Sequence, residues 1–314
     1  MRAAVVRSYG SPEVVQVRDL PRPEVGRGQV LVRVAAAAVT SGDARIRAAR
    51  FPAGFGPFAR LAFGVLRPRR PVLGSAFSGV VGAVGPGVVD LAAGDRVCGM
   101  TGMRMGAHAE HLVAGADRVT SVPPSVSHED AAGVLFGGTT ALHFLRGRAE
   151  VGPGTTVLVN GASGAVGTNA VQLAAYLGGR VTGVCSAANR DLVLGLGAER
   201  VLSHDVHDVL QAGRFDVVLD TVGNLTIASG QRLLAPGGVL ALAVAGLGQT
   251  LRARGNVVAG SAPERVTDYE LLLGLVAVGT LRVVTDRIVA LDDMVEAHRL
   301  VDSGRKRGNV LVRP

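Results

Sequence analysis

The sequence predicts an α/β protein with two domains, and three observations lead to this prediction. The chain has 314 residues, a length that suits two cores of ordinary size. Hydrophobic residues make up 48% of it and charged residues 18%, a balance typical of large buried cores. Short valine-rich runs fill the first part, whereas strand-like and helix-like segments alternate in the middle. The first pattern is typical of a β-barrel, and the second of a doubly wound parallel sheet.

The first region, residues 1–124, is expected to form the β-rich domain. Its strands are RAAVVRSY, VVQVRD, QVLVRVAAAAV, FSGVVGAVG and DRVCGM, with Gly, Pro and Asp between them. The segment 52–71 is apolar, glycine-rich and loop-like. We expect either a lid beside a binding site or an irregular surface insertion there.

The second region, residues 125–262, is expected to form the parallel sheet. A helix over 127–147 opens it, with Ser127 as the N-cap. The strands TVLVNG, RVTGVCS, ERVLSH, FDVVLDTVG, GVLALAVA and NVVAG alternate with helices such as AVGTNAVQLAAYLG and NRDLVLGLG. Residues 263–314 hold two further helices, DYELLLGLVAVGTL and LDDMVEAHRLVDSG, and a closing strand, NVLVRP. The sheet domain is thus inserted between the β-rich domain and a C-terminal return to it.

The turn after the first strand of this sheet is the strongest signal of a ligand. Three glycines lie between the strand and the helix that follows it. Glycine allows a tight turn and a close approach to a pyrophosphate, and the helix N-terminus adds unpaired N–H groups. The common G-x-G-x-x-G pattern would have glycine in place of Ala162, so the turn is a variant, and a tight turn without a ligand is the alternative. The expected contacts are Gly161, Ser163, Gly164, Ala165, Val166 and Gly167.

The end of the second strand predicts which dinucleotide binds. Sites for NAD place an acidic residue there, about 20 positions past the glycines. This chain has Ser186, followed by Asn189 and Arg190. An acid would repel a 2′-phosphate, whereas a hydroxyl, an amide and a guanidinium would bind it, so NADPH is favoured over NADH. The alternative is that Arg190 is an exposed helix residue that misses the phosphate, and Asp191 is expected to point away.

Charge and cysteine content bear on partners and compartment. The net charge is +8, and Lys306 is the sole lysine. Two basic clusters, RPRRP (67–71) and GRKRG (304–308), lack interleaved aromatic residues, so solvated surface is expected rather than a nucleic-acid site. No run resembles a signal peptide or a membrane span. Cys98 and Cys185 are expected to be reduced thiols, which favours a cytoplasmic protein without membrane contact.

Over nearly its whole length the chain resembles the zinc-independent medium-chain dehydrogenase/reductases of the quinone oxidoreductase type. The motifs that carry the resemblance are GSAFSGVVGAVGPGV (74–88), GDRVCG (94–99), GAHAEHLV (106–113), NGASGAVG (160–167), LGAERV (196–201), DTVG (220–223), PGG (236–238) and AHRLVDSGRKRGNVLV (297–312). The resemblance implies a GroES-like substrate domain, 1–124 and 263–314, with a Rossmann domain inserted at 125–262. It also implies hydride transfer from NADPH in the cleft between them.

The resemblance bears on zinc as well, which needs three or four Cys, His or carboxylate ligands. Zinc-dependent relatives have a cysteine where this chain has Thr40, and a His-Glu pair where it has Ser75 and Ala76. Their later cysteine would fall near Phe136. A structural zinc lobe needs four cysteines, and this chain has 2. No metal is therefore expected.

The polar residues of the cleft are transferred from matching motifs of the family. Thr40, Asp43 and Thr140 are the catalytic candidates, with helix capping by Asp43 and helix packing by Thr140 as the alternatives. Many relatives have a tyrosine at Phe51 and an asparagine at Thr40, so the proton is expected from solvent. Phe51 and Phe77 are expected in the substrate pocket. The remaining cofactor contacts are expected at Thr221, Val222, Gly223, Val244, Ala245 and Asn309.

Together these features predict an NADPH-dependent reductase of quinones or of the activated C=C bond of enones. The substrate is expected to be a small apolar carbonyl compound or quinone. A homodimer is expected through edge strands of the nucleotide domain, with GVLALAVA as the candidate unless its apolarity reflects burial. The alternative function is a non-catalytic NADPH-binding protein with a structural or RNA-binding role, which the charge of +8 keeps open.

Overall fold

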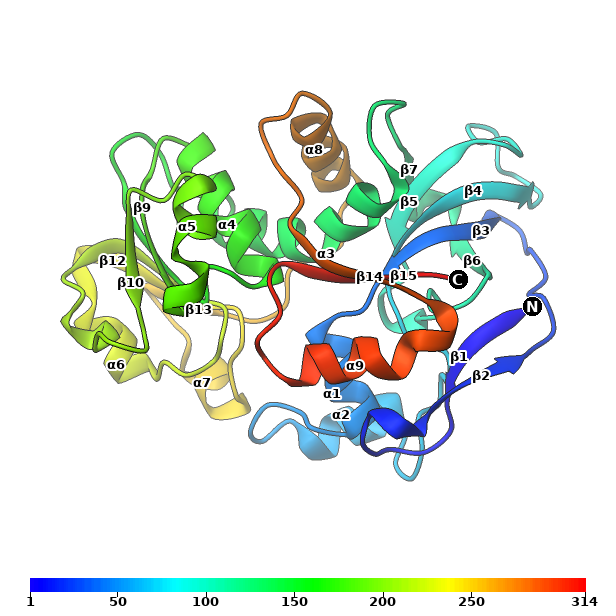
Figure 1. Ribbon diagram of the computed structural model, residues 1–314, viewed down its shortest axis with the longest axis horizontal. Coiled ribbons are helices and arrows are strands. Elements are labelled where there is room, and N and C mark those ends of the chain that lie inside the picture. The colour runs from blue at the N-terminus through cyan, green and yellow to red at the C-terminus, as the bar shows by residue number, and fades with distance from the viewer.

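The computed structural model describes residues 1–314, which build two sheets that lie side by side (Figure 1). A seven-stranded sheet has the order β14-β15-β3-β4-β5-β7, with β6 paired to β3, and β1 and β2 form a separate hairpin-like pair. Strands from both ends of the chain therefore share the barrel. Their bounds are β1 Arg2–Val6, β2 Val15–Asp19, β3 Gln29–Ala38, β4 Ala76–Val84, β5 Arg96–Met100, β6 His111–Gly115, β7 Val119–Ser121, β14 Thr285–Ala290 and β15 Asn309–Arg313.

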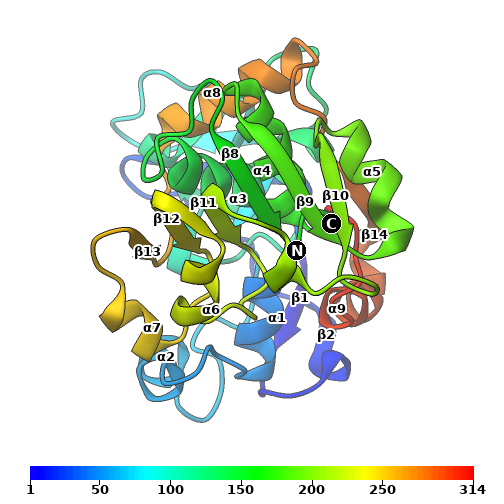
Figure 2. The same ribbon diagram turned by 90° about the vertical axis from the view of Figure 1, so that its left-hand side faces the viewer.

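The second sheet is six-stranded and wholly parallel, as the alternating pattern predicts (Figure 2). Its order is β10-β9-β8-β11-β12-β13, so the direction of winding reverses between β8 and β11. Ligands of such sheets bind beyond the carboxyl ends of the strands at this switch point. The bounds are β8 Thr156–Asn160, β9 Arg180–Cys185, β10 Arg200–Ser203, β11 Phe215–Asp220, β12 Leu234–Leu242 and β13 Val257–Ala259.

Helix α3 (His128–Leu145) joins the two domains. Ser127 is its N-cap, as predicted, and accepts a hydrogen bond from the Asp130 N–H at 3.0 Å. One hydrophobic cluster of 35 buried residues contains side chains of α3, of both sheets and of α8 (Val266–Ala277). The two domains thus pack on one shared core. The other helices are α1 Ser41–Ala48, α2 Gly56–Phe63, α4 Ala165–Tyr176, α5 Arg190–Gly195, α6 Ile227–Arg232, α7 Leu247–Arg252 and α9 Met294–Asp302.

Several expectations need correction. The segment 52–71, expected to be a loop, contains α2, and β14 was not predicted. The strand proposed as a dimer edge, β12, pairs with β11 on one side and β13 on the other, so its apolarity reflects burial. The edge strands of this sheet are β10 and β13. The fold class is confirmed, whereas the homodimer and the domain boundaries at 124 and 262 stay predictions. No helix has both the length and the apolar character that crossing a membrane requires.

Candidate functional site

The turn between β8 and α4 requires glycine at two positions. Gly161 has a φ of +83°, and a Cβ on it would lie 2.6 Å from the Thr221 Oγ1. A Cβ on Gly167 would lie 2.1 Å from the Gly161 carbonyl oxygen. Gly164 is the N-cap of α4, and the N–H groups of Val166 and Gly167 have no acceptor within the protein. Free donors at a helix N-terminus fit an anionic group such as a pyrophosphate.

The barrel contacts this turn through the residue before β15. The Gly308 N–H donates to the Ser163 carbonyl at 2.8 Å, and Gly164 and Gly308 form a parallel bridge. Lys306 donates from its Nζ to the Gly308 carbonyl, and burial lowers the pKa of Lys306 to about 8. The glycine turn is therefore fixed to the closing strand of the other domain.

The end of β9 also meets the glycine turn. The Asn189 Nδ2 donates to the Ser163 Oγ at 3.1 Å. Ser186 is half-buried, and Arg190 is exposed at the start of α5. The sequence analysis missed Asp205, which accepts a hydrogen bond at 2.9 Å from the Ala187 N–H, just after β9. That bond lowers the pKa of Asp205. This corner thus offers a hydroxyl, an amide and a guanidinium beside one carboxylate.

A buried carboxylate organises the turn after β11. Asp220 is fully buried and accepts a hydrogen bond from the Asn160 Nδ2 at 2.9 Å. Thr221 donates from its Oγ1 to the Asn160 carbonyl at 2.7 Å. The turn therefore holds its residues at the carboxyl edge of the sheet, where the sequence predicts cofactor contacts. Asp220 also accepts from the backbone N–H groups of Val222, Gly223 and Leu225.

Three of the predicted cofactor contacts line one pocket of about 240 Å³ at the ends of β11 and β12. They are Gly223, Val244 and Ala245. From the barrel side the same pocket is lined by Phe51, whose ring stacks on Phe63 with centroids 5.9 Å apart. The structure thus brings together residues that the sequence assigned separately to cofactor and substrate.

Two arginines of this pocket were missed by the sequence analysis. Arg45 lies on α1, and Arg50 follows that helix. Burial lowers the pKa of Arg45. No acidic residue lines the pocket, so it carries positive charge at the edge of the dinucleotide site. Sequence alone gave no signal for this, because the two side chains meet β11 and β12 only through the tertiary fold.

A larger pocket of about 950 Å³ lies between the two domains. Thr40, Ser75 and Phe136 line it, so the positions that hold zinc in zinc-dependent relatives lie together here. They offer two hydroxyl groups and an aromatic ring, which is not a ligand set for zinc. The chain holds no group of three His, Cys, Asp or Glu side chains placed to bind a metal ion.

Thr40 and Asp43 also line this pocket but are committed to each other. Thr40 is the N-cap of α1, and its Oγ1 donates to the Asp43 Oδ2 at 2.6 Å. The Asp43 carboxylate also accepts from the Thr40 N–H at 2.8 Å and from the Gly74 N–H at 2.9 Å. The helix therefore begins at Ser41 rather than after Asp43. Asp43 is its third residue (N3) and forms a capping box with the N-cap Thr40, so it is not itself the N-cap.

Three other predicted residues lie apart from the cleft or turn inward. Phe77 is fully buried in the barrel core, so its assignment to the substrate pocket is wrong. Side chains alternate along β4, so the neighbours of Phe77, Ala76 and Ser78, face α3 instead. Asn309 is buried and donates to the Val284 carbonyl at 2.9 Å, and its role as a cofactor contact stays a prediction. Thr140 donates to the Phe136 carbonyl at 2.8 Å, one turn back along α3.

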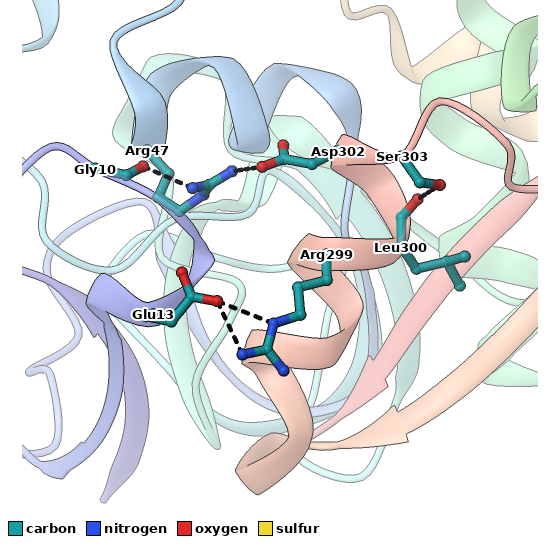
Figure 3. A network of polar contacts seen from close by, with 7 residues as sticks. All are labelled: Gly10, Glu13, Arg47, Arg299, Leu300, Asp302 and Ser303. Carbon is teal, nitrogen blue, oxygen red and sulfur yellow. Dashed lines mark hydrogen bonds and ion pairs between the residues drawn. The ribbon is translucent and has the colours of Figure 1, made fainter.

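A buried ion pair holds α1 against α9 (Figure 3). The Arg47 side chain is fully buried, pairs with Asp302 and donates from Nη1 to the Gly10 carbonyl at 2.6 Å. About one turn earlier on α9, Arg299 pairs with Glu13. These contacts fix α1, and with it the wall of the cleft that carries Thr40.

A barrel with an inserted dinucleotide-binding sheet defines a known class of enzymes, and family comparisons agree with it. Residues 26–124 match the family described as alcohol dehydrogenase GroES-like domain, and residues 196–312 match the one described as zinc-binding dehydrogenase. The trans-enoyl reductase pgmF of Aspergillus terreus is 32% identical over 92% of this chain and 87% of its own length. The chain belongs to the medium-chain dehydrogenase/reductase family.

Solved structures identify the branch of the family. The quinone oxidoreductase of Coxiella burnetii superposes with a TM-score of 0.90 and is 28% identical, covering 100% of this chain and 99% of its own. A mycobacterial protein complexed with NADPH has a TM-score of 0.83 and 28% identity, with 100% of both chains covered. The protein is a quinone oxidoreductase-like oxidoreductase of this family, and family membership supports a pyridine nucleotide as its cofactor.

Proposed function

We propose that the protein is an NADPH-dependent, zinc-independent reductase of quinones or of the activated C=C bond of enones. The observation that carries the proposal is the corner where the Asn189 amide meets Ser163 of the glycine turn, with Ser186 in place of the usual acid. A hydroxyl, an amide and the Arg190 guanidinium suit a 2′-phosphate. The mycobacterial relative complexed with NADPH supports the same choice.

In this proposal the chain binds and orients the cofactor with groups already described. The free N–H groups at the start of α4 hold the pyrophosphate, and Val244 and Ala245 border the nicotinamide. When bound, the nicotinamide supplies a hydride to an electron-poor carbon of the acceptor. The 950 Å³ pocket beside Thr40 holds the acceptor.

The proton is proposed to come from solvent. The Thr40 hydroxyl donates a hydrogen bond to Asp43, and Asp43 accepts three hydrogen bonds. Neither group is therefore available as a proton donor to the pocket. The Thr140 hydroxyl donates a hydrogen bond to the Phe136 carbonyl within α3. The absence of zinc is proposed because Thr40, Ser75 and Phe136 replace its ligands.

The cofactor assignment is tested by steady-state kinetics with NADPH and NADH on a set of quinones and cyclic enones. We expect kcat/KM to be higher with NADPH. In Arg190→Ala, kcat/KM with NADPH should fall about 10- to 100-fold, since a charge-assisted contact to phosphate is lost, and kcat/KM with NADH should not change. Arg254→Ala is the matched control, because Arg254 precedes β13 at the opposite edge of the sheet.

Each other outcome has a defined meaning. A preference for NADH contradicts the phosphate site and assigns Asp205 to the ribose hydroxyls instead. Tight NADPH binding without turnover of any acceptor favours the alternative, a non-catalytic NADPH-binding protein. Activity lost after treatment with a chelator contradicts the zinc-independent reaction.

A further inference from the structure

The chain between Asp43 and Asp90 contains seven arginines and no acidic residue. All seven lie between Arg45 and Arg70, on and after α1 and α2, and only Arg47 has a carboxylate partner, Asp302. A quinone or a simple enone carries no charge and has no use for so many cations. The charge therefore needs another explanation, and the positions of the cavities supply one.

Three pockets adjoin one another from the cleft to the surface. The 950 Å³ cleft pocket shares Ile46, Phe63, Arg70 and two methionines with a second pocket of about 210 Å³. Most of the second pocket is apolar. It shares Pro68 and Arg69 with a third pocket of about 650 Å³. The methionines are Met103 and Met105.

The third pocket is lined by basic residues without acidic neighbours. Arg7, Arg67 and Arg69 line it, together with the backbone of 64–68. These three guanidinium groups are exposed and form no ion pair or side-chain hydrogen bond within the protein. Unpaired guanidinium groups gathered at one pocket are a binding site for phosphate or carboxylate.

The turn that carries Arg67 and Arg69 is preformed. Gly64 has a φ of +124°, and its carbonyl accepts a hydrogen bond from the Tyr9 hydroxyl at 2.5 Å. The Arg69 N–H donates to the Phe63 carbonyl at 2.6 Å, and the Val6 N–H to the Pro71 carbonyl at 2.7 Å. Because these three hydrogen bonds fix the backbone, little backbone entropy is lost when the arginines bind an anion.

We propose that the acceptor is an amphiphile whose anionic end, a phosphate or a carboxylate, binds at Arg7, Arg67 and Arg69. Its reducible group lies in the cleft pocket, and its apolar middle lies along Ile46 and Phe63. This inference rests on the proposed function, because it names the substrate class of the same cleft.

The test compares two thioesters with the same reducible group. Crotonyl-coenzyme A carries phosphates, whereas crotonyl-N-acetylcysteamine carries none. With NADPH saturating, we expect kcat/KM to be at least about 10-fold higher for the coenzyme A thioester. The double variant Arg67→Ala/Arg69→Ala should lower kcat/KM for the coenzyme A thioester to that of the uncharged thioester. Arg148→Ala/Arg232→Ala removes the same charge elsewhere and should change neither value.

A second pair of substrates tells whether the site binds a phosphate or a carboxylate. Monomethyl fumarate and dimethyl fumarate differ by one carboxylate, so a preference for the first without one for coenzyme A identifies a carboxylate site. Calorimetry measures the binding of free coenzyme A to the NADPH-saturated protein, and this measurement does not depend on turnover. The double variant should weaken this binding about 10-fold or more.

The inference is overturned if neither anionic compound is preferred over its neutral partner, or if coenzyme A binding is the same in both double variants. In that case the reduction of neutral quinones or enones leaves the proposed function intact. If coenzyme A binds through Arg67 and Arg69 but no acceptor is reduced, the reductase is contradicted and the anion site stands.

Discussion

The two walls of the cleft are built on buried carboxylates, but they differ in what surrounds each one. On the barrel side, Asp43 accepts hydrogen bonds from Thr40 and Gly74. On the cofactor side, Asp220 accepts one from Asn160 and three from the turn after β11. Both acids fix backbone, and neither faces the cleft with a free oxygen. Asp43 and Asp220 therefore stabilise the backbone beside the site and have a structural role rather than a catalytic one.

The surroundings of the two acids lead to different properties. Around the Asp43 wall lie the buried Arg47, His108 and His298. Burial, together with the neighbouring His108 and Arg47, lowers the pKa of His298 to about 3. Around Asp220 the buried polar residues, such as Asn160, are neutral. We therefore expect protonation of His298 to destabilise the barrel wall as the pH falls.

The largest expected effect is at Asp220. Asp220→Ala leaves three backbone N–H groups and one of the two amide N–H groups of Asn160 without an acceptor, and should lower the free energy of unfolding by about 4 kcal/mol. Asp43→Ala removes fewer hydrogen bonds and should cost about 2–3 kcal/mol. Urea denaturation of both variants measures the difference. The exposed Asp191→Ala is the control and should stay within about 0.5 kcal/mol of wild type. An equal or larger loss at Asp43 breaks the comparison.

The second effect concerns pH. His298 has a folded-state pKa below its ordinary value of 6.5, so the unfolded chain binds a proton between pH 6.5 and 3 that the folded protein does not. Stability should therefore fall on acidification, by about 2 kcal/mol between pH 6.5 and 5 from this group. His298→Leu should remove that part of the slope in urea titrations at each pH, and His207→Ala, at an exposed position, should retain it. A His298→Leu slope equal to wild type would place the acid sensitivity elsewhere.

The smallest effect sharpens the role of Thr40. Thr40→Ala removes the N-cap of α1 and should lower stability by about 1 kcal/mol. Thr40→Ser retains the hydroxyl and should stay within about 0.5 kcal/mol of wild type. We expect kcat to be nearly unchanged in Thr40→Ser, since the hydroxyl binds Asp43 and not the substrate. A large loss of kcat in Thr40→Ala that Thr40→Ser does not share would make the Thr40 hydroxyl catalytic after all.

The parts of the fold that the sequence predicted are those with a strong period. The parallel strands are runs of Val and Leu, and they were found because burial on both faces leaves little room for polar residues. Helix α2 was missed because Gly56 is its first residue and Gly54 and Gly64 flank it, and so many glycines in a short segment are typical of a loop.

Among the site residues, the local contacts were predictable and the long-range ones were not. The capping box at Thr40 and Asp43 has a sequence signature that would have identified it. The inward orientation of Phe77 follows from alternation along β4 and could also have been found. Arg45, Asp205 and Gly308 had no such signal, because each meets the dinucleotide site through residues far away in the chain. Their discovery required the fold.

The connection of the barrel has a consequence for how the protein is made. β15 pairs with β3 through Leu311 and Ala38, and Gly308 holds the glycine turn. The ribosome synthesises the whole parallel sheet before it synthesises β15. A nascent chain therefore has only the Ala37–Ala38 end of β3 unpaired on that edge while the cofactor domain folds, because β6 already pairs with Gln29–Arg33. The barrel and the cofactor turn can be completed only together, in the same late step.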